Sequence, residues 1–322
     1  MRLRLVPADT RWDFFRYARI TMMGSAVAMA LSILLMLVLG LNYGIDFRGG
    51  TIIRTLSKLP VDVGEYRSAV SGLDLGDVAI SQVYDISFGP EENVAQIRIE
   101  AQAGDEAVAA DTVRLIEEAL RNLDPDMKFP LVESVGPKVS GELIQKAVLA
   151  VFAAIAAVLF YIWVRFEWQF SLGAVAALVH DVVLTLGIFS ALQIKFDLAI
   201  IAALLTIVGY SLNDTVVVFD RVRENLRRMK KPALREVLNL SINSTLSRTV
   251  MTSVTTLIAL LALFVFGGDV IRGFVFAMIW GVIVGTYSSV FIASSMLLRL
   301  GVKRDWSKPD KGSGTKFSSN AT

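Results

Sequence analysis

The sequence of 322 residues contains no cysteine and only one histidine, His180. Disulfide bonds and thiol chemistry are therefore excluded. Without a Cys/His cluster or an HExxH motif, we expect no bound metal. The chain also lacks a P-loop and a GxGxxG motif after a strand, so nothing indicates that it hydrolyses a nucleotide. We predict a protein that is not an enzyme and carries no cofactor.

Charged residues are also scarce, at 19%, whereas hydrophobic residues make up 54% of the chain. The apolar residues gather in six runs of about 20 residues, a length that crosses a bilayer core at about 1.5 Å per residue. The first run is too long for a signal-peptide core and lacks a small-residue cleavage site, which favours an uncleaved anchor. The predicted fold class is an α-helical, polytopic membrane protein. Its predicted spans are residues 20–41, 146–166, 170–192, 198–219, 249–266 and 274–298.

Between the first two spans, residues 42–137 form a hydrophilic segment with 17 acidic and eight basic residues. Its apolar periodicity predicts the order β-α-β-β-α-β, which is that of a ferredoxin-like α+β sandwich. The segment contains no convergent catalytic set, which favours a folded handle or contact module. The predicted strands are 50–56, 78–87, 94–101 and 129–135, and the predicted helices are 62–73 and 105–123.

The distribution of Lys and Arg predicts the orientation in the membrane, because cytoplasmic loops are rich in these residues. The first nineteen residues hold five, the segment 220–247 holds seven and the tail 299–322 holds six. The other two short loops hold only Lys195 and Arg272. We therefore expect both termini and a basic 220–247 loop in the cytoplasm, and residues 42–137 on the outer side.

The first nineteen residues also mix arginines with aromatic residues. This composition next to a span is typical of an amphipathic segment that lies along the cytoplasmic membrane surface and contacts lipid, and it does not favour nucleic-acid binding. The tail has few apolar residues, and we expect it to be disordered.

The fourth span contains a carboxyl group, Asp214, before its apolar run has ended. A charge inside a membrane costs at least about 2.5 kcal/mol on insertion scales and is a functional hypothesis by default. Arg248 stands at the cytoplasmic start of the fifth span, at about the level of Asp214, and Thr252 continues its helix face. We interpret Asp214 and Arg248 as a proton relay, supported by Ser211, Asn213 and Thr252. The alternative is that Arg248 only extends to the lipid headgroups.

A second polar pair, His180 and Asp181, lies about 16 Å deep in the third span. It is either a second station of the relay or a hydrogen-bonded pair that fixes helix packing. In the sixth span, Gly281 and Gly285 form a GxxxG motif, a close-packing face for another helix.

Gly49 and Gly50, just beyond the first span, are candidate hinge residues between the span and the hydrophilic segment. Glycine at this point is equally compatible with a simple turn.

Two aspartates on neighbouring spans also occur in intramembrane proteases. The estimated depths separate Asp181 from Asp214 by about 8 Å along the membrane normal, too far to share a proton. Leu212 and Asn213 precede Asp214 in place of a GxGD motif.

A scaffold without proton coupling leaves Asp214 unexplained. Six spans with a soluble domain after the first instead resemble one half of a resistance-nodulation-division (RND) exporter, which implies a partner half.

Five stretches of the chain stand out: GLNYGIDFRGGT, LVHDVVLTLG, VGYSLNDTVVVFDRVREN, SRTVMTSVTT and VIRGFVFAMIWGVIVGTYSS. They closely resemble the SecF family, the smaller membrane component of the bacterial SecD–SecF complex. The resemblance extends from Asp13 to about Leu300. It implies a SecD partner, association with the SecY–SecE–SecG channel and YajC, and a location in the inner membrane. It also implies that the proton motive force helps preproteins to complete translocation, with Asp214 and Arg248 matching the family's proton-conducting pair.

Overall fold

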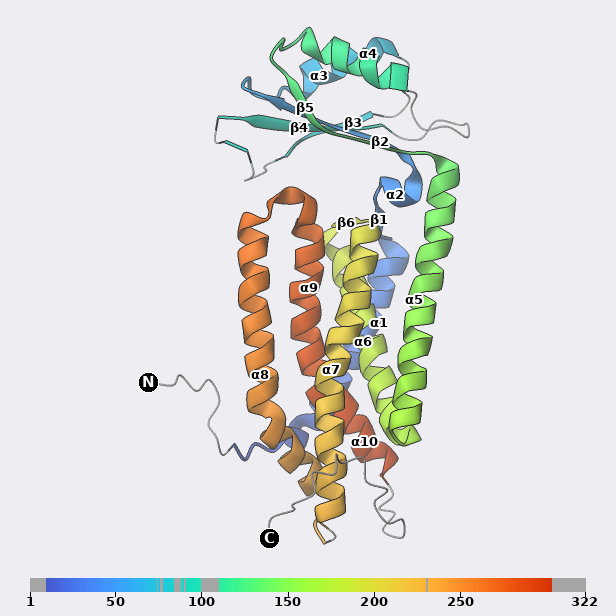
Figure 1. The fold of residues 1–322 in the computed structure, drawn as a ribbon, viewed down its shortest axis with the longest axis vertical. Helices are drawn as coiled ribbons and strands as arrows, with labels where there is room; N and C mark the ends of the chain where they lie inside the picture. The colour runs from blue at the N-terminus through green and yellow to red at the C-terminus, as the bar shows by residue number, and fades with distance from the viewer. Residues whose placement is uncertain are drawn as a thin grey trace, which may run out of the picture.

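The computed structural model describes residues 10–73, 75, 78–83, 88–89, 91–99, 110–229 and 231–302. A bundle of long helices carries a small sheet domain at one end (Figure 1). Six of the described helical segments are long and apolar enough to cross a membrane, which confirms the predicted fold class. The spanning helices are α1 (Ala18–Val38), α5 (Pro137–Arg165), α6 (Trp168–Leu192), α7 (Leu198–Arg228), α8 (Leu234–Phe266) and α9 (Gly268–Ser288).

The sixth span changes its hydrogen-bond pattern after α9. A π-helical turn, Ser289–Ala293, follows α9 and leads into α10 (Ser294–Leu300). Such turns are rare and occur frequently at functional sites.

Helices α6, α7 and α9 form the interior of the bundle, whereas α1 and α5 are exposed along most of their length. The GxxxG glycines lie where α9 meets α7. A Cβ atom at Gly281 would overlap the Ile207 side chain, and one at Gly285 would lie 3.1 Å from the Ser211 Cβ. The two backbones therefore approach as closely as the motif permits.

Three helices continue well past their predicted spans. α5 begins at Pro137, before its predicted start at residue 146. Residues 220–247, expected as a loop, are helical except for the short connection after Arg228 and before Leu234. The extensions are stabilised by an Asn225–Ser241 hydrogen bond of 2.9 Å and by ion pairs of Glu224 with Arg221 and Arg228. The predicted spans ended where the apolar runs end. The polar residues beyond these ends continue the same helices, because side-chain pairs along a helix also stabilise it in water.

The sheet domain comprises β2 (Gly50–Ser57), α3 (Val63–Val70), η2 (Ser71–Leu73), β3 (Val78–Val83), β4 (Asn93–Ile99), α4 (Ala110–Arg121) and β5 (Lys128–Val135). Its antiparallel strands have the order β3-β4-β2-β5, which confirms the ferredoxin-like prediction. Helices α3 and α4 cover the face of the sheet that points away from the bundle (Figure 1). Residues 84–87, 100–101 and 105–109 of the predicted elements lie outside the described part of the chain.

A short junction that the sequence did not predict joins the two parts. It consists of β1 (Asn42–Tyr43), α2 (Ile45–Arg48) and β6 (Lys195–Phe196). β1 pairs in parallel with β6, so the exit of α1 is bound to the connection between α6 and α7.

At the opposite end of the bundle, the described start of the chain forms η1 (Phe14–Tyr17) and packs against α8. Asp13 forms an ion pair of 2.7 Å with Arg235 and accepts a hydrogen bond from Asn239. The Trp12 backbone exchanges two hydrogen bonds with Asn243. Residues 10–17 are therefore held by α8. Residues 1–9 of the predicted membrane-surface segment 1–19, and residues 303–322 of the predicted tail 299–322, lie outside the described residues.

Candidate functional site

Asp214 lies on the inward face of α7, with only 3% of its surface exposed. Its Oδ2 atom has no hydrogen-bond partner among the described residues. Buried polar atoms in proteins are nearly always satisfied, and an exception needs an explanation such as water or a functional role. Asp214 is therefore the strongest candidate on α7 for a group that gains and loses a proton.

Arg248, on α8, interacts electrostatically with Asp214. Its side chain is exposed, and within the described residues no ion pair or hydrogen bond joins it to Asp214. The neighbouring Thr249 is buried, and its Oγ1 also lacks a partner there. The two predicted relay residues are thus not in direct contact: Asp214 is buried, whereas Arg248 is exposed.

The supporting residues of the predicted relay separate in the structure. Asn213 points to the outside of the bundle. Thr252 donates to the Thr249 carbonyl of its own helix. Ser211 donates to Asp181 Oδ2 over 2.6 Å, so it belongs to the second polar pair and not to Asp214.

Asp181 is completely buried and is the centre of a polar cluster that joins three helices. Its Oδ1 lies 3.0 Å from His180 Nδ1. Its Oδ2 accepts hydrogen bonds from Ser211 of α7 and, over 2.8 Å, from Ser288 of α9. Sequence reasoning missed Ser288, although it lies in the sixth span three residues after Gly285, on the same helix face. The cluster satisfies both carboxyl oxygens of Asp181.

His180 extends this cluster toward α1. Its ring stacks on Tyr287 with centroids 5.9 Å apart, and Tyr287 donates to the Thr21 carbonyl over 3.1 Å. The Tyr287 hydroxyl also lies 3.0 Å from Ser25 Oγ. His180 Nε2 is buried without a partner among the described residues. Polar groups on α1, α6, α7 and α9 thus form one connected set.

One outer flank of the bundle is unusually polar for a membrane surface. The exposed positions of α7 are small or polar, whereas α1 and α5 expose large apolar side chains such as Leu31 and Phe152. A polar helix face at membrane depth is expected to meet protein or water and not lipid. We call the exposed small and polar residues of this flank the polar face; it comprises Ala202, Thr206, Gly209 and Asn213 of α7 and Ser244, Ser247, Arg248 and Thr255 of α8. One large apolar side chain, Met251 of α8, is exposed among them.

The predicted hinge glycines connect α2 to β2. Gly49 and Gly50 have φ angles of 74° and 119°, a region that residues with a Cβ rarely adopt. The backbone at this point therefore requires glycine.

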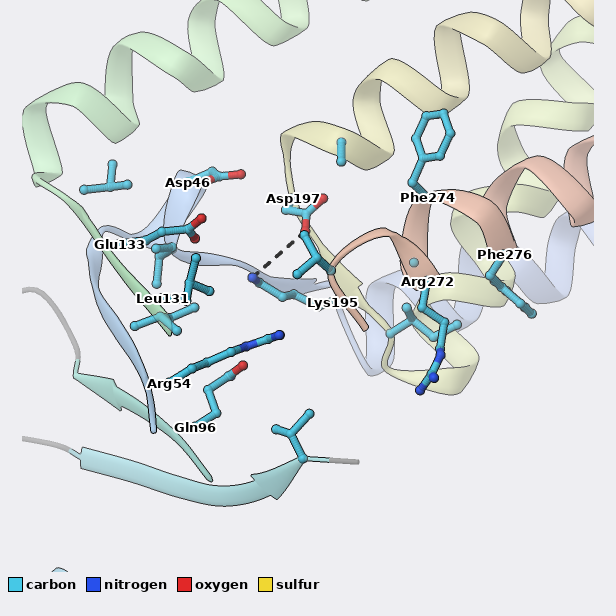
Figure 2. Close-up of a pocket in the computed structure, with 18 of the residues that line it drawn as sticks. Asp46, Arg54, Gln96, Leu131, Glu133, Lys195, Asp197, Arg272, Phe274 and Phe276 are labelled. Atoms are coloured by element: carbon cyan, nitrogen blue, oxygen red, sulfur yellow. Dashed lines mark ion pairs between the residues drawn. The ribbon is translucent and has the colours of Figure 1, made fainter. Parts of the chain in front are cut away.

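A cleft of about 1,020 Å³ lies between the open face of the sheet and the end of the bundle (Figure 2). Arg54, Gln96 and Glu133 line it from the sheet, and Lys195, Asp197 and Arg272 line it from the bundle. Burial raises the pKa of the Asp197 carboxyl, and Lys195, 4.0 Å away, partly opposes this shift. In the described part of the chain, no three His, Cys, Asp or Glu side chains gather in a way that could hold a metal ion.

Two family descriptions match the chain. Residues 115–303 match the family "Protein export membrane protein SecD/SecF, C-terminal". Residues 34–55 match the "SecD/SecF GG Motif", which includes Gly49 and Gly50.

Curated relatives are similar over the whole chain. Protein translocase subunit SecF of Cereibacter sphaeroides is 58% identical, covering 98% of this chain and 98% of the relative. The subunit of the same name from Rhodobacter capsulatus is 56% identical, covering 99% and 97%.

Solved structures share the fold. The crystal structure of SecDF, a translocon-associated membrane protein from Thermus thermophilus, matches with a TM-score of 0.80 and 35% identity over 93% of this chain. A structure of SecDF in a Super-membrane-facing form matches with a TM-score of 0.68. In both cases this chain covers 40% of the longer SecDF chain.

Proposed function

Because this chain belongs to the SecF family of protein translocase subunits, we propose that it acts with SecD to couple the proton motive force to protein export. In this proposal the complex helps preproteins to complete their passage across the bacterial inner membrane, next to the SecY–SecE–SecG channel and YajC. The sheet domain faces the periplasm and both termini face the cytoplasm, as the distribution of Lys and Arg predicts.

The observation that carries the proposal is the buried carboxyl of Asp214, whose Oδ2 atom has no hydrogen-bond partner among the described residues. A neutral Asp214 is tolerated at this depth, whereas an ionised one needs a cation or donors. Loss of the proton therefore favours an arrangement in which Arg248 approaches, and protonation favours its release. One proton that crosses about 100 mV supplies about 2.3 kcal/mol, enough to shift the balance of two helix arrangements substantially.

The polar face supports the need for a partner half. Six spans form one half of an RND-type bundle, and in that architecture a second half covers one flank. A SecD half on the polar face would shield Asn213 and Arg248 from lipid and would enclose the region into which Asp214 can exchange its proton. The apolar side chains of α1 and α5 would then face lipid.

The test is gradient-dependent preprotein release from vesicles that contain the complex with SecD. Asp214→Asn should assemble normally and abolish the part of release that depends on the proton gradient. Asp220→Asn is the matched control, because Asp220 lies on the same helix but is exposed and pairs with Arg165 over 3.0 Å. Normal gradient-dependent release by Asp214→Asn would refute the proposal.

A further inference from the structure

The first turn of α7, the helix that carries Asp214, is held by a residue from a distant part of the chain. The Leu198 amide donates to Asp46 Oδ2 over 2.9 Å, and the Ile200 amide donates to Asp197 Oδ1 over 3.2 Å. Amides in the first turn of a helix have no partner within it, and a carboxylate at this end is favourable. Asp197 is the local cap, whereas Asp46 belongs to α2, 152 residues away in sequence. Figure 2 shows Asp46 and Asp197 close to the start of α7.

Other contacts also fix the segment around α2 to this end of α7. The Gly44 amide donates to the Phe196 carbonyl over 2.8 Å, and β1 pairs with β6. The rings of Tyr43, Phe47 and Phe196 pack on one another with centroids 5.8–6.1 Å apart. A Cβ atom at Gly44 would lie 2.9 Å from Lys195 Cε, so the two backbones are close. Residues 42–48 are therefore joined to Lys195 and Phe196, which lead into α7, and Asp46 adds a hydrogen bond to α7 itself. We call residues 42–48 with the start of α7 the α2–α7 unit.

On its other side, α2 continues through Gly49 and Gly50 into β2. β2 is a central strand of the sheet, paired with both β4 and β5. Two glycines with positive φ angles thus lie between the α2–α7 unit and the sheet. The sheet has a second link to the bundle, because β5 leads through Gly136 into α5, where Ser140 donates to the Ile45 carbonyl of α2 over 3.4 Å. The cleft of about 1,020 Å³ between the sheet and the bundle leaves room for one to tilt against the other.

We propose that Asp46 is a positioning residue that couples the sheet domain to α7. A displacement of α7 that follows a change at Asp214 is transmitted through the Leu198–Asp46 hydrogen bond to α2. It then bends the chain at Gly49–Gly50 and tilts the sheet. This inference rests on the proposed function, and it gives the GG-motif segment a mechanical role.

Two substitutions at Asp46 distinguish proton flux through the complex from its coupling to preprotein release. Asp46→Ala removes the acceptor of the Leu198 amide, whereas Asp46→Asn keeps an acceptor oxygen. In the purified complex with SecD, Asp46→Ala should retain proton flux within about twofold of wild type but lose most gradient-dependent preprotein release. Asp46→Asn should retain both activities. Asp62→Ala, which removes the corresponding cap of α3 from Gly64 and Glu65, is the matched control and should also retain both.

Three outcomes would overturn the inference. They are normal release by Asp46→Ala, a parallel loss of flux and release in that variant, and uncoupling by Asp62→Ala as well. The absence of proton flux in wild type would instead contradict the proposed function itself, so the two failures are distinguishable.

A distance measurement tests whether the chain bends at Gly49–Gly50, and it does so without altering Asp46. The chain has no cysteine, so spin labels can be placed only where they are introduced. Labels at the exposed residues Arg48 and Ala199 report on α2 relative to α7, and labels at Ser68 and Ala199 report on the sheet domain relative to α7. Between wild type and the Asp214→Asn variant, the first distance should stay constant and the second should change. A change in the first distance, or constancy of the second, would contradict bending at Gly49–Gly50.

Discussion

Two buried aspartates on neighbouring helices have opposite surroundings. Asp181 is surrounded by His180, Ser211 and Ser288, whereas the Asp214 Oδ2 atom has no partner among the described residues. A buried carboxyl with complete hydrogen bonding is held in one arrangement, and one without it can change partners. The residue environments thus favour a structural role for Asp181 and the mobile proton for Asp214.

The structural role of Asp181 predicts how its two serine donors behave. Ser211→Ala and Ser288→Ala should each lower the free energy of unfolding by about 1–3 kcal/mol, because each removes one donor from a buried carboxyl oxygen. The double variant should cost more than the sum, because Oδ2 then loses both donors. Thermal unfolding in detergent measures this, with Ser247→Ala, at an exposed serine of α8, as the control. Strictly additive losses, or losses no larger than that of the control, would contradict the cluster.

The roles of individual residues could be predicted from the sequence only in part. Charged residues are rare in apolar runs, and this alone was enough to single out Asp181, Asp214 and Arg248. Ser211 lies only three residues before Asp214, so spacing along α7 could not tell which aspartate it serves. That choice depends on how α9 and α6 pack against α7, and contacts between helices are not encoded in the period of one helix.

At the scale of elements, the close contact of α7 with α9 lets Ser211 of α7 and Ser288 of α9 donate to the same oxygen of Asp181. The absence of a side chain at Gly281 allows Ile207 to pack against the α9 backbone. Gly285 does the same for Ser211, four residues further along each helix. The spacing of the glycines in the sequence predicted a packing face, but not which helix it meets.

A small substitution at this contact should therefore be costly. Gly281→Ala places a methyl group inside the Ile207 side chain, and overpacking of this kind costs about 1–3 kcal/mol. Gly24→Ala is the matched control, because a Cβ there meets nothing within 4 Å and alanine favours a helix by about 1 kcal/mol over glycine. Unfolding midpoints should fall for Gly281→Ala and stay equal or rise for Gly24→Ala. Equal midpoints for the two variants would contradict the close contact.

The start of α7 predicts a pH dependence. Burial raises the pKa of Asp197 above its usual 3.8, so the native state disfavours the charged form. The contribution of this group to stability is therefore complete below about pH 4 and is lost as pH rises through the raised pKa. Asp197→Asn keeps a capping oxygen without the charge. Its unfolding midpoint should equal that of wild type below about pH 4 and exceed it at neutral pH, and the reverse order at neutral pH would contradict the assignment.

The ends of the helices and strands could be predicted only where the apolar pattern of the sequence marks them. The apolar runs gave the six spans, and strand alternation with two amphipathic segments gave the ferredoxin-like order. The polar ends of α7 and α8 carry no apolar signal, so their helical continuation was missed. β1 and β6 are each two residues long, too short for any periodicity, and they pair across some 150 residues of sequence.

At the scale of the whole molecule, α7 extends from the cleft under the sheet domain through the membrane to the opposite end of the bundle (Figure 1). It is capped by Asp46 at one end, carries Asp214 further along, and packs on α9 through Gly281 and Gly285. One helix thus connects the buried Asp214 to the contacts under the sheet domain, which is the connection that the proposed coupling needs. The polar face of the same helix is where we propose that the partner half packs.

Proton flux through the purified complex with SecD, reconstituted in vesicles under an imposed gradient, tests the central claim most directly. Wild type and the Asp220→Asn control should conduct protons at similar rates. Asp214→Asn should reduce the flux to the level of empty vesicles, because the asparagine amide cannot carry the proton. Wild-type flux through the Asp214→Asn complex would contradict the claim that Asp214 is the proton-exchanging group.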